Sequence, residues 1–569
     1  MRARVAIAAV ASALPLVLML VARSTVQLRT LPERLMETFL LVIPPDQFEA
    51  AIEKYGPMAK DYALIGTNLG MFIALFAIAL FVLTRNLPTT AVLLLGCGLW
   101  LVTAVVLFPI TGAGFFATEL PLQSPALVNA VYVGIGLAYA SLLIAGEMFT
   151  ARRATKDVLP APISAARRSL VVGAGGSAVA FLVAFWFGRS AGTVVSSLPM
   201  ASVPDVAPTP APVDPAPDPT PEAANPAPAP TPVPSPTPNP YPEPPPARDL
   251  ARDKDGALLA VNRPRGQLQE LVTRNPDFYT VTKNAGGDPT LSARDWRLII
   301  DGAVNTPVQL DYLGLSKLPQ VRFYKTLECI SNLTAMCELT AFGCDLLSTA
   351  EWTGARLADV IKLAGGLKPG VVAIAAIGAD EFSSALPADA LDDPEVILAY
   401  QMNGEVLPRE HGFPVRLIIP GRYGLKNAKW IVRLQPMTQT YVDWYGQRNW
   451  NQLGIVKTTS RIDLPINGAT LTAGSIDIAG VAYAGNRGVA TVEFSADGGA
   501  SWQQASFVEP ALGKDTFVRW QSSFQLTAGQ KTSLVVRATD GTGELQPEGF
   551  SLPQPDGGSG WHTIDVTAS

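Results

Sequence analysis

The sequence predicts a multidomain chain, with an all-α membrane anchor, a mixed α+β domain and a C-terminal all-β sandwich. The first 190 residues are strongly apolar, and 20 of the 49 prolines fall between residues 201 and 248. Short alternating strands with tight turns fill the sequence after residue 455. A length of 569 residues suffices for three or four domains. We therefore expect an anchor over residues 1–190, a linker over 191–264, an α+β domain over 265–452 and a β domain over 453–569.

Five apolar runs approach the roughly 20 residues that a helix needs to cross a bilayer. They are residues 5–22, 62–84, 89–110, 127–149 and 169–188. The first run is expected to be an uncleaved helix, because no small-residue cleavage site follows it. Basic residues of the short loops all fall on one side, and they are Arg2, Arg4, Arg85, Arg152, Arg153, Lys156, Arg167 and Arg168. By the positive-inside rule that side is cytoplasmic, so five spans place the chain after residue 190 outside the cell membrane.

Histidine content and charge limit the chemistry of the apolar runs. The chain has only two histidines, His411 and His562, and both lie far beyond the runs. A haem held by paired histidines is therefore not expected in this chain, and electrons would pass to or from a separate partner. The runs hold almost no charge, which disfavours a transporter with an external sensor domain. With 43 basic and 48 acidic residues and no long basic stripe outside the membrane-flanking loops, nucleic acid is not an expected partner.

Other features of the anchor are interpreted as follows. Cys97 in the third run is expected to be a small buried apolar residue. The amphipathic segment from Leu31 to Tyr55 either lies on the membrane surface or forms an ordered loop. The fifth run begins with Arg167 and Arg168 followed by apolar residues, which resembles the twin-arginine export pattern. That pair is either an export signal for a folded domain or two ordinary arginines of the cytoplasmic side.

The proline-rich stretch cannot bury a core and is expected to sample extended polyproline II, at about 3.1 Å per residue. Fully extended, it would reach on the order of 150 Å from the membrane. We interpret it as a spacer, with low-complexity binding as the lesser alternative.

The domain that follows mixes strand and helix signals. Trp296–Gly302 alternates like a strand that ends in a turn. Val415–Ile419 is typical of a buried strand, and a proline and a glycine close it. Trp352–Ile361 reads as a turn that leads into an amphipathic helix. These signals favour an α+β fold.

Several motifs of this domain occur in the order found in one family. They are Thr326–Asn332 (TLECISN), Trp352–Leu357, Met402–Gly404, His411–Arg416 and Tyr423–Trp430. Together they resemble the molybdopterin-binding domain of the sulfite oxidase family, over about residues 265–450. The resemblance implies a molybdenum–molybdopterin cofactor and a two-electron transfer of an oxygen atom.

The resemblance also implies roles for individual residues. Cys329 corresponds to the cysteine whose thiolate binds molybdenum, and a soft thiolate suits such a metal. His411 and Arg416 match residues that hold the pterin and its phosphate, and the planar fork of arginine suits a phosphate. Lys426 and Lys429 fall in the loop that supplies further basic and backbone contacts to the cofactor.

Lys283 and Asn284 match an arginine–asparagine pair that approaches the metal in sulfite oxidases, so Lys283 is a candidate catalytic residue. Lysine is a less exact partner for an oxyanion than arginine. Sulfite oxidases also carry two arginines shortly after the ligand cysteine, where this chain has the uncharged residues 331–334. The tyrosine expected shortly after Trp444 is not found among residues 448–450. These departures argue against sulfite as the substrate.

Cys337 and Cys344 lie seven residues apart in an insertion that follows the ligand. Outside the cell the expected state is a local disulfide. A second metal site is the alternative, but two cysteines without nearby histidines are too few ligands. A bridge here is expected to rigidify a loop over the molybdenum pocket, while Cys329 stays out of it.

The last part of the chain reads as strands with tight turns. Arg461–Pro465, Gly480–Gly485 and Val492–Ser495 alternate, and Asp497–Gly499 forms a turn, which predicts an immunoglobulin-like sandwich. This part is similar to the dimerisation domain of the same family, so a homodimer is an expected assembly. His562 is expected to be an ordinary surface residue.

The sequence thus predicts a membrane-anchored, extracytoplasmic molybdenum–pterin oxidoreductase that acts on a small substrate, with the direction of transfer left open. Electrons would be exchanged with a cytochrome, a quinone-linked protein or a soluble carrier. The alternative hypothesis is a non-catalytic scaffold of the cell envelope that keeps the fold. The retention of Cys329, His411 and Arg416 together speaks against that alternative.

Overall fold

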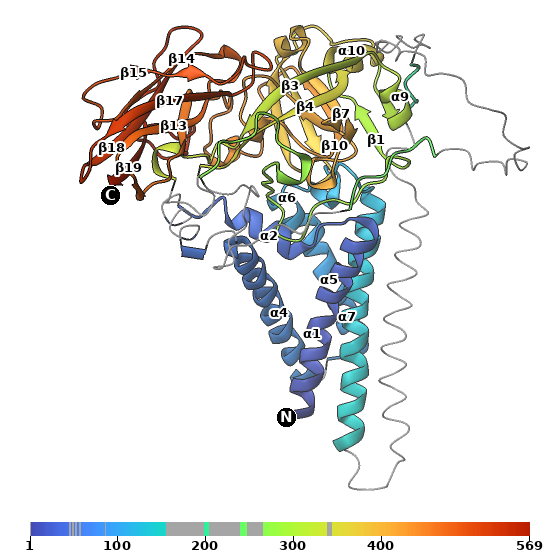
Figure 1. The fold of residues 1–569 in the computed structure, drawn as a ribbon. Helices are drawn as coiled ribbons and strands as arrows, with labels where there is room; N and C mark the ends of the chain where they lie inside the picture. Colours follow the sequence, from blue (N-terminus) through green and yellow to red (C-terminus); the bar gives the residue numbers. More distant parts are fainter. Residues whose placement is uncertain are drawn as a thin grey trace, which may run out of the picture.

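The protein is described here by a computed structural model. It describes residues 2–44, 58–85, 87–154, 198–203, 239–246, 266–337 and 344–569, together with four positions between 45 and 57. Two β-rich units lie side by side at one end, and apolar helices extend from them to the other end (Figure 1). The N-terminus lies at the end of the helices that is remote from the β-rich units.

The apolar helices pack into a bundle. They are α1 (Arg2–Val26), α4 (Ala59–Arg85), α5 (Thr89–Val102) and α7 (Pro125–Ala154), and α5 continues through a π turn (Thr103–Leu107) into α6 (Phe108–Ile110). Among the described residues, 4 helices are long and apolar enough to cross a membrane, and they coincide with the first four predicted runs. The fifth run, 169–188, and the twin-arginine sequence lie outside the described residues. The prediction for Cys97 is wrong, because this cysteine is exposed on the surface of α5.

A short helix, α2 (Leu31–Phe39), follows α1 at the β-rich end of the bundle. A capping box begins it, since Thr30 Oγ1 accepts the Glu33 amide at 3.3 Å and the Glu33 carboxylate accepts the Thr30 amide at 2.7 Å. The helix buries apolar and charged side chains alike, including Met36 and Glu37. It is therefore covered by protein, whereas the sequence suggested a membrane-surface segment or a loop.

The α+β domain contains two sheets and short helices. One sheet has the order β2-β1-β10-β5-β6, and the other has the order β3-β4-β7-β8 with β9 also paired to β7. The elements are β1 (Arg297–Ile300), β2 (Val308–Asp311), α9 (Tyr312–Ser316), β3 (Gln320–Glu328), β4 (Leu347–Arg356), α10 (Leu357–Leu363), β5 (Ala373–Gly378), β6 (Ser383–Pro387), β7 (Ile397–Met402), β8 (Glu405–Val406), β9 (Arg416–Ile418) and β10 (Ile431–Met437). Both sheets contribute to one large core, which includes Trp296, Leu398 and Trp430.

Two of the three elements predicted for this domain are confirmed. Strands β1 and β9 occupy the predicted Trp296–Gly302 and Val415–Ile419. The prediction for Trp352–Ile361 is wrong in its first half, because residues 352–356 continue strand β4 and only the rest begins α10. β4 pairs with β3 on one side and with β7 on the other, and these ladders override the local turn signal.

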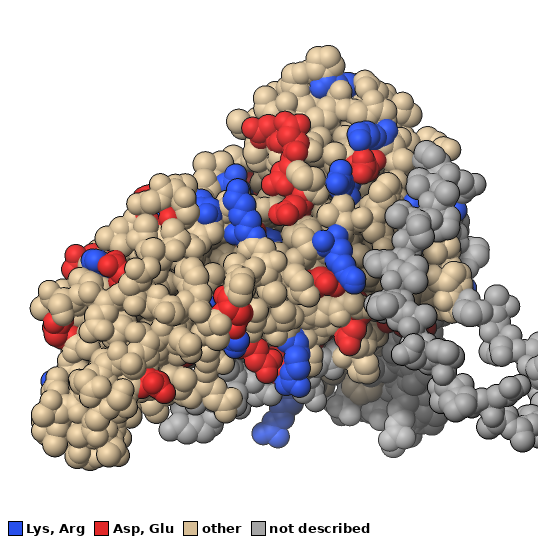
Figure 2. Space-filling view, turned by 45° about the horizontal axis from the view of Figure 1, so that its top comes forward, with Lys and Arg blue, Asp and Glu red and all other residues tan. Residues whose placement is uncertain are grey.

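The C-terminal domain is a sandwich of two sheets with a shared core around Trp520, Phe494 and Leu534. The sheet orders are β11-β13-β17-β16 and β12-β19-β18-β14-β15. The strands are β11 (Thr459–Leu464), β12 (Ala469–Leu471), β13 (Gly474–Tyr483), β14 (Val489–Ser495), β15 (Gln503–Gln504), β16 (Ser506–Phe507), β17 (Val518–Leu526), β18 (Lys531–Asp540) and β19 (His562–Ala568). The three predicted strands correspond to β11, to the end of β13 and to β14. On the face shown in Figure 2, lysines and arginines are interspersed with aspartates and glutamates.

Two described pieces of the predicted linker lie on the α+β domain. The Ala201 amide donates to Gln309 O at 2.8 Å, and the Gln309 amide donates to Pro199 O at 3.0 Å, so residues 198–203 extend the sheet beyond β2. Tyr241 packs against the large core from residues 239–246. The linker is therefore bound to the domain at these two places, rather than free along its whole length. Residues 204–238 lie outside the described part.

One buried carboxylate joins the two β-rich domains. Asp515, which precedes β17, forms an ion pair with Lys325 of β3. It also accepts hydrogen bonds from the Tyr483 hydroxyl at 2.7 Å and from the Gly421 amide at 2.9 Å. Lys325 and Asp515 are almost completely buried. Since β3 ends at Glu328, this contact fixes the strand that carries the next residue, Cys329.

Replacing Asp515 with alanine should lower the free energy of unfolding by about 3–5 kcal/mol, because it leaves the Lys325 ammonium buried without its partner. Urea denaturation of the purified chain, followed by tryptophan fluorescence, measures this loss. The control is Asp359→Ala, which breaks a pair with Lys362 whose lysine is 74% exposed. That change should cost less than about 1 kcal/mol. Equal losses in the two variants would contradict a special role for Asp515.

Candidate functional site

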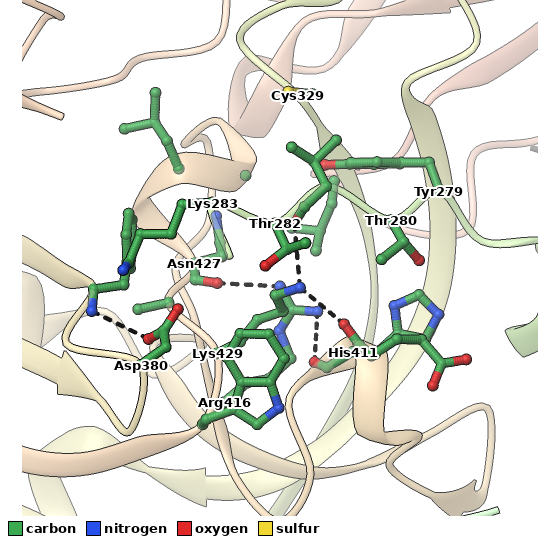
Figure 3. Close-up of a pocket in the computed structure, with 18 of the residues that line it drawn as sticks. Tyr279, Thr280, Thr282, Lys283, Cys329, Asp380, His411, Arg416, Asn427 and Lys429 are labelled. Carbon is green, nitrogen blue, oxygen red and sulfur yellow. Dashed lines mark hydrogen bonds between the residues drawn. The ribbon is translucent and has the colours of Figure 1, made fainter. Parts of the chain in front are cut away.

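A cavity opens where strand β3 ends. Most of its lining comes from four segments: Phe278–Lys283, the residues around Cys329, the loop at Glu410 and His411, and Gly424–Trp430. Asp380, Phe382, Arg416 and Tyr445 complete it. Figure 3 shows that side chains from these separate segments converge on one space.

Cys329 lies in the turn that follows β3. Its amide donates to Leu346 O at 3.0 Å, and its carbonyl accepts the Asn332 amide at 2.9 Å. The Asn332 side chain fixes the same turn, because it donates to Glu328 Oε1 at 2.8 Å and accepts the Leu346 amide at 3.1 Å. The Cys329 thiol is free and only 7% exposed, and its burial raises the pKa of the thiol. A thiolate at this position therefore needs a metal or another positive partner to be stable.

Arg416, which is buried, and Lys429, which is half-buried, bring two positive charges to the opposite part of the cavity. Arg416 donates to His411 O at 3.0 Å and to Asn427 O at 3.1 Å, while its Nε has no partner among the described residues. Burial lowers the pKa of Arg416 to about 10. Lys429 donates to Glu410 O at 2.9 Å and to a second carbonyl oxygen at 3.2 Å, and burial lowers its pKa to about 8. Within the described residues both cations bond only to carbonyl oxygens, so this part of the cavity favours an anion.

His411 borders the same space from a short turn between β8 and β9. Its ring lies edge-on to Phe278, with 5.3 Å between the ring centroids, and its Nε2 is 3.2 Å from Asn275 O. The next residue, Gly412, has a φ of 115°, and a Cβ there would approach Arg416 Cβ to 3.0 Å. Glycine at this position therefore lets His411 and Arg416 reach the cavity from one tight turn.

The structure brings most of the predicted site residues together. Cys329, His411, Arg416, Lys429 and Lys283 all line the cavity. Asn284 and Lys426 do not line the cavity, because their side chains are bonded elsewhere. Asn284 donates to Asp380, which itself lines the wall, at 3.2 Å, whereas the Lys426 ammonium is buried in an ion pair with Asp443. Lys426 therefore holds the chain just before Trp444 instead of facing a cofactor.

The sequence interpretation missed several residues of the cavity wall. Tyr445 lines the cavity, so the prediction that the tyrosine after Trp444 is lost is wrong, because residue 445 itself is that tyrosine rather than one of residues 448–450. Burial raises the pKa of Tyr445, so its phenol stays protonated at neutral pH. Thr280 also lines the wall, and its buried hydroxyl has no partner among the described residues. Asp380 follows β5 in a loop without any motif, so no sequence signal could have identified it.

The insertion after Cys329 forms the predicted disulfide. Cys337 and Cys344 are bridged, with an S–S distance of 2.10 Å. Among the described residues, no group of three or more His, Cys, Asp or Glu side chains could hold a metal, so the second metal site gains no support. The two cysteines contact the sandwich domain rather than the cavity, through His562 Nε2 at 3.3 Å from Cys337 Sγ and through Arg461, which donates to Cys344 O. The residues between them, 338–343, lie outside the described part.

His562 is not the surface residue that the sequence suggested. It is 6% exposed, and its Nδ1 accepts the Ile462 amide at 2.9 Å. Burial, together with the nearby Arg461 charge, lowers the pKa of His562 to about 4.

The residues of the cavity fit a metal held by an anionic organic cofactor. Cys329 offers one soft ligand, and the missing ligands of a metal at this place would come from the bound group. The unpartnered Arg416 Nε and Thr280 hydroxyl, with the Lys429 ammonium, suit the phosphate of such a group. A thiolate ligand at one end and an anion site at the other define a metal–cofactor binding protein.

Comparisons with known proteins identify the kind of metal–cofactor protein that this chain resembles. Residues 285–445 match the oxidoreductase molybdopterin binding domain, and residues 453–567 match the Mo-co oxidoreductase dimerisation domain. The chain is 31% identical over 323 residues to mitochondrial sulfite oxidase of Mus musculus, which covers 50% of this chain and 59% of that protein. It is 29% identical over 334 residues to the NADH nitrate reductase of Solanum lycopersicum, which covers 49% of this chain and 36% of that protein.

A solved structure is also similar, that of the sulfane dehydrogenase SoxCD from Paracoccus pantotrophus. Its TM-score is 0.44 at 27% identity, over 49% of this chain and 75% of that chain. The chain thus spans less than two thirds of the length of the mouse relative. Residues 285–567 are similar, in both domains, to the sulfite oxidase family of molybdenum-dependent oxidoreductases, in agreement with the resemblance of the motifs.

Replacing Arg416 with methionine should reduce the bound pterin per chain about tenfold or more, because it removes a charge-assisted contact to a buried anion. Fluorescence of the oxidised pterin, released from the purified chain, measures the loss. The matched control is Arg356→Met, at the exposed end of β4, which should keep the full pterin content. Normal pterin in Arg416→Met would contradict the anion site.

Lowering the pH from 7 to 4.5 should destabilise the protein partly through His562. The folded protein binds this proton more weakly than the unfolded chain, whose histidine pKa is near 6.5. The contribution of His562 to the free energy of unfolding is therefore fully present above about pH 6.5. It is lost as the pH falls toward 4, and the total loss is about 3 kcal/mol. A His562→Gln variant, which cannot take up the proton, should lose less stability over the same pH range in urea denaturation. Parallel losses in the parent and the variant would contradict the assignment.

Proposed function

We propose that the protein is a membrane-anchored molybdenum–pterin oxidoreductase, which transfers an oxygen atom to or from a small substrate in a two-electron step. It would exchange those electrons with a separate redox partner. The main support is the convergence of Cys329 with the anion site of Arg416 and Lys429 in one cavity. A non-catalytic scaffold would have no use for a buried and a half-buried cation that lack carboxylate partners among the described residues.

The residues of the cavity then take distinct roles. When bound, the molybdenum centre supplies the two-electron redox chemistry. Cys329 would ligate the metal through its sulfur, and Arg416, Lys429 and Thr280 would hold the phosphate of the pterin. His411, packed against Phe278, would border the pterin and keep its orientation.

Lys283 and Tyr445 are candidates for the substrate side of the cavity. The protonated phenol of Tyr445 can donate a hydrogen bond to a substrate oxygen, and Lys283 supplies positive charge. We further propose that sulfite is not the preferred substrate. Lys283 stands where sulfite oxidases have an arginine, and an ammonium lacks the two-pronged geometry of a guanidinium.

The bundle supports a place for this domain outside the cytoplasm. The N-terminus with Arg2 and Arg4 lies at the far end of α1, away from the β-rich units (Figure 1). Arg85 ends α4, and the positive-inside rule assigns these basic ends to the cytoplasm. The catalytic domain would then lie on the opposite, extracytoplasmic side, where the disulfide of Cys337 is stable. Because the sandwich matches a dimerisation domain, we also propose a homodimer.

The test is the molybdenum content of the full chain, purified in detergent from cells that make the cofactor. About one metal per chain is expected, and light scattering should give the mass of two chains. Cys329→Ala should disturb the molybdenum EPR signal, whereas Cys97→Ala, which changes the other free cysteine, should leave it unchanged. A folded parent without molybdenum and pterin would reject the enzyme and favour the scaffold. Turnover of sulfite as fast as of any other substrate in a screen would reject the substrate proposal.

A further inference from the structure

One side of the cavity faces the helical bundle. Lys283, a residue of the cavity wall, pairs with Glu37 of α2 at 2.9 Å. The carbonyl of its neighbour Thr282 accepts a hydrogen bond from the Lys60 ammonium, at the start of α4. Two separate elements of the proposed anchor therefore contact the wall of the cavity. Lys283 and Tyr445 lie on the side of the cavity that we assign to the substrate. The contacts made by Glu37 and Lys60 are therefore on that side.

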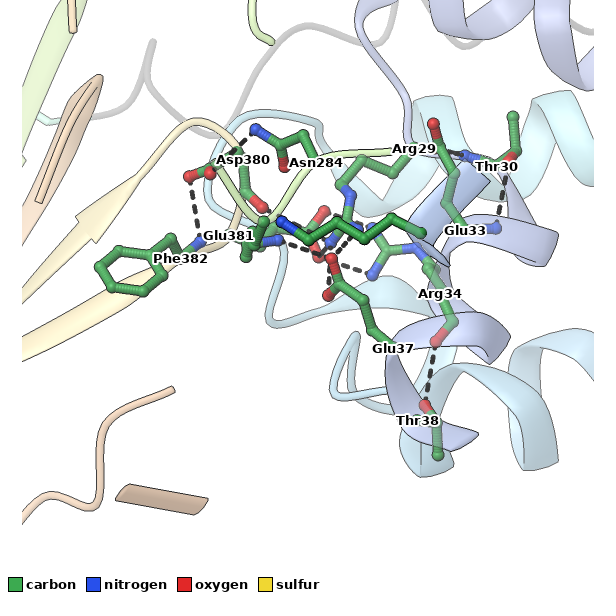
Figure 4. A network of polar contacts seen from close by, with 12 residues as sticks. Arg29, Thr30, Glu33, Arg34, Glu37, Thr38, Asn284, Asp380, Glu381 and Phe382 are labelled. Atoms are coloured by element: carbon green, nitrogen blue, oxygen red, sulfur yellow. Dashed lines mark hydrogen bonds and ion pairs between the residues drawn. The ribbon is translucent and has the colours of Figure 1, made fainter. Parts of the chain in front are cut away.

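Glu37 is the centre of a buried ion network (Figure 4). Arg29 donates to its two carboxylate oxygens at 2.5 and 3.1 Å, and Lys283 donates to Oε1 at 2.9 Å. Burial by itself would raise the pKa of Glu37, but Lys283 and Arg29 lower it below its usual value. The carboxylate is therefore charged, and it fixes the Lys283 side chain while neutralising part of its charge.

A second ion pair joins the same two domains without touching Lys283. Glu381, in the loop after β5, pairs with Arg34 of α2 and lies 3.6 Å from Arg29. Figure 4 shows Glu381 and Glu37 on the same side of α2. The two carboxylates differ in one respect that matters for the site, because only Glu37 bonds to a residue of the cavity wall.

Lys60 adds a positive charge to this side. Within the described part of the chain, the Thr282 carbonyl is its hydrogen-bond acceptor, and no carboxylate lies within ion-pair distance. The sequence has no positive charge at residues 331–334, directly after the ligand. Lys60 therefore supplies from the bundle a charge that this part of the motif lacks.

We infer that the bundle completes the substrate side of the active site, in which Lys60 binds a small anionic substrate and Glu37 positions and partly neutralises Lys283. Lys60 acts by direct contact with the anion, and Glu37 acts through Lys283 as a positioning residue. The inference rests on the proposed function and narrows its substrate to a small anion.

The test measures the binding of sulfate, an inert oxyanion, to the full chain in detergent by calorimetry at fixed low ionic strength. Molybdenum per chain is measured first in every variant, so that a failure of the proposed function is recognised separately. Lys60→Met should weaken sulfate binding about tenfold, because one charge-assisted contact is lost. Lys60→Arg should stay within about threefold of the parent, since the charge is kept. The control Lys54→Met, at an exposed lysine that lies over the Tyr55 ring, should bind like the parent.

The Glu37→Gln variant should change the sulfate affinity in the opposite direction to Lys60→Met. Glutamine can still accept the Lys283 hydrogen bond, but the site gains one net positive charge, so sulfate should bind at least about threefold more tightly. Glu381→Gln breaks a comparable buried pair and should leave sulfate binding unchanged. A role of Glu37 in stability alone would not tighten the binding of an anion.

The inference is overturned by any of three results in chains that carry normal molybdenum. They are no sulfate binding by the parent, parent-like binding by Lys60→Met, and equal binding by Glu37→Gln and Glu381→Gln. A parent without molybdenum would instead reject the proposed function itself.

Discussion

The position of Cys329, the proposed metal ligand, depends on the buried contact between Asp515 and Lys325. That carboxylate binds strand β3 through Lys325, the loop at Gly421 through its amide, and the sandwich through Tyr483. β3 leads directly to Cys329, and the loop at Gly421 leads to the segment that ends at Lys429. One charge thus fixes two walls of the cavity relative to the second domain. Burying a charge is costly unless it is fully bonded, so the three segments are held in one arrangement.

Two positive charges of the cavity, unlike that of Lys325, do not lie in a buried ion pair with a described carboxylate. Arg416 and Lys429 donate to carbonyl oxygens, and the described residues offer them no carboxylate. Their lowered pKa values reflect the cost of keeping these charges away from water. A bound anion would offset that cost, which couples the stability of this region to the cofactor. Part of the free energy of anion binding would therefore come from groups that the fold leaves without a charged partner.

The bundle is more than a tether in this arrangement. A long free stalk would let the catalytic domain move far from the helices, but Glu37 and Glu381 tie the two together through buried ion pairs. Residues 198–203 also add to the sheet next to β2, so the chain rejoins the domain soon after the fifth predicted run. Proline content alone could not predict these contacts. Composition indicates how stiff a segment is, but it does not indicate where the segment binds the domain.

The sequence by itself indicated the resemblance to the family, the proposed metal ligand and the proposed anion-binding arginine. Cys329, His411 and Arg416 lie in contiguous motifs, whose local chemistry is visible in the order of residues. It also determined four of the apolar helices, because length and hydropathy are local properties. Only the tertiary structure decided that Lys426 turns away to Asp443, that His562 is buried, and that Glu37 and Lys60 reach the cavity wall. These are contacts between residues distant in the chain, and no local pattern encodes which distant charge will meet which partner.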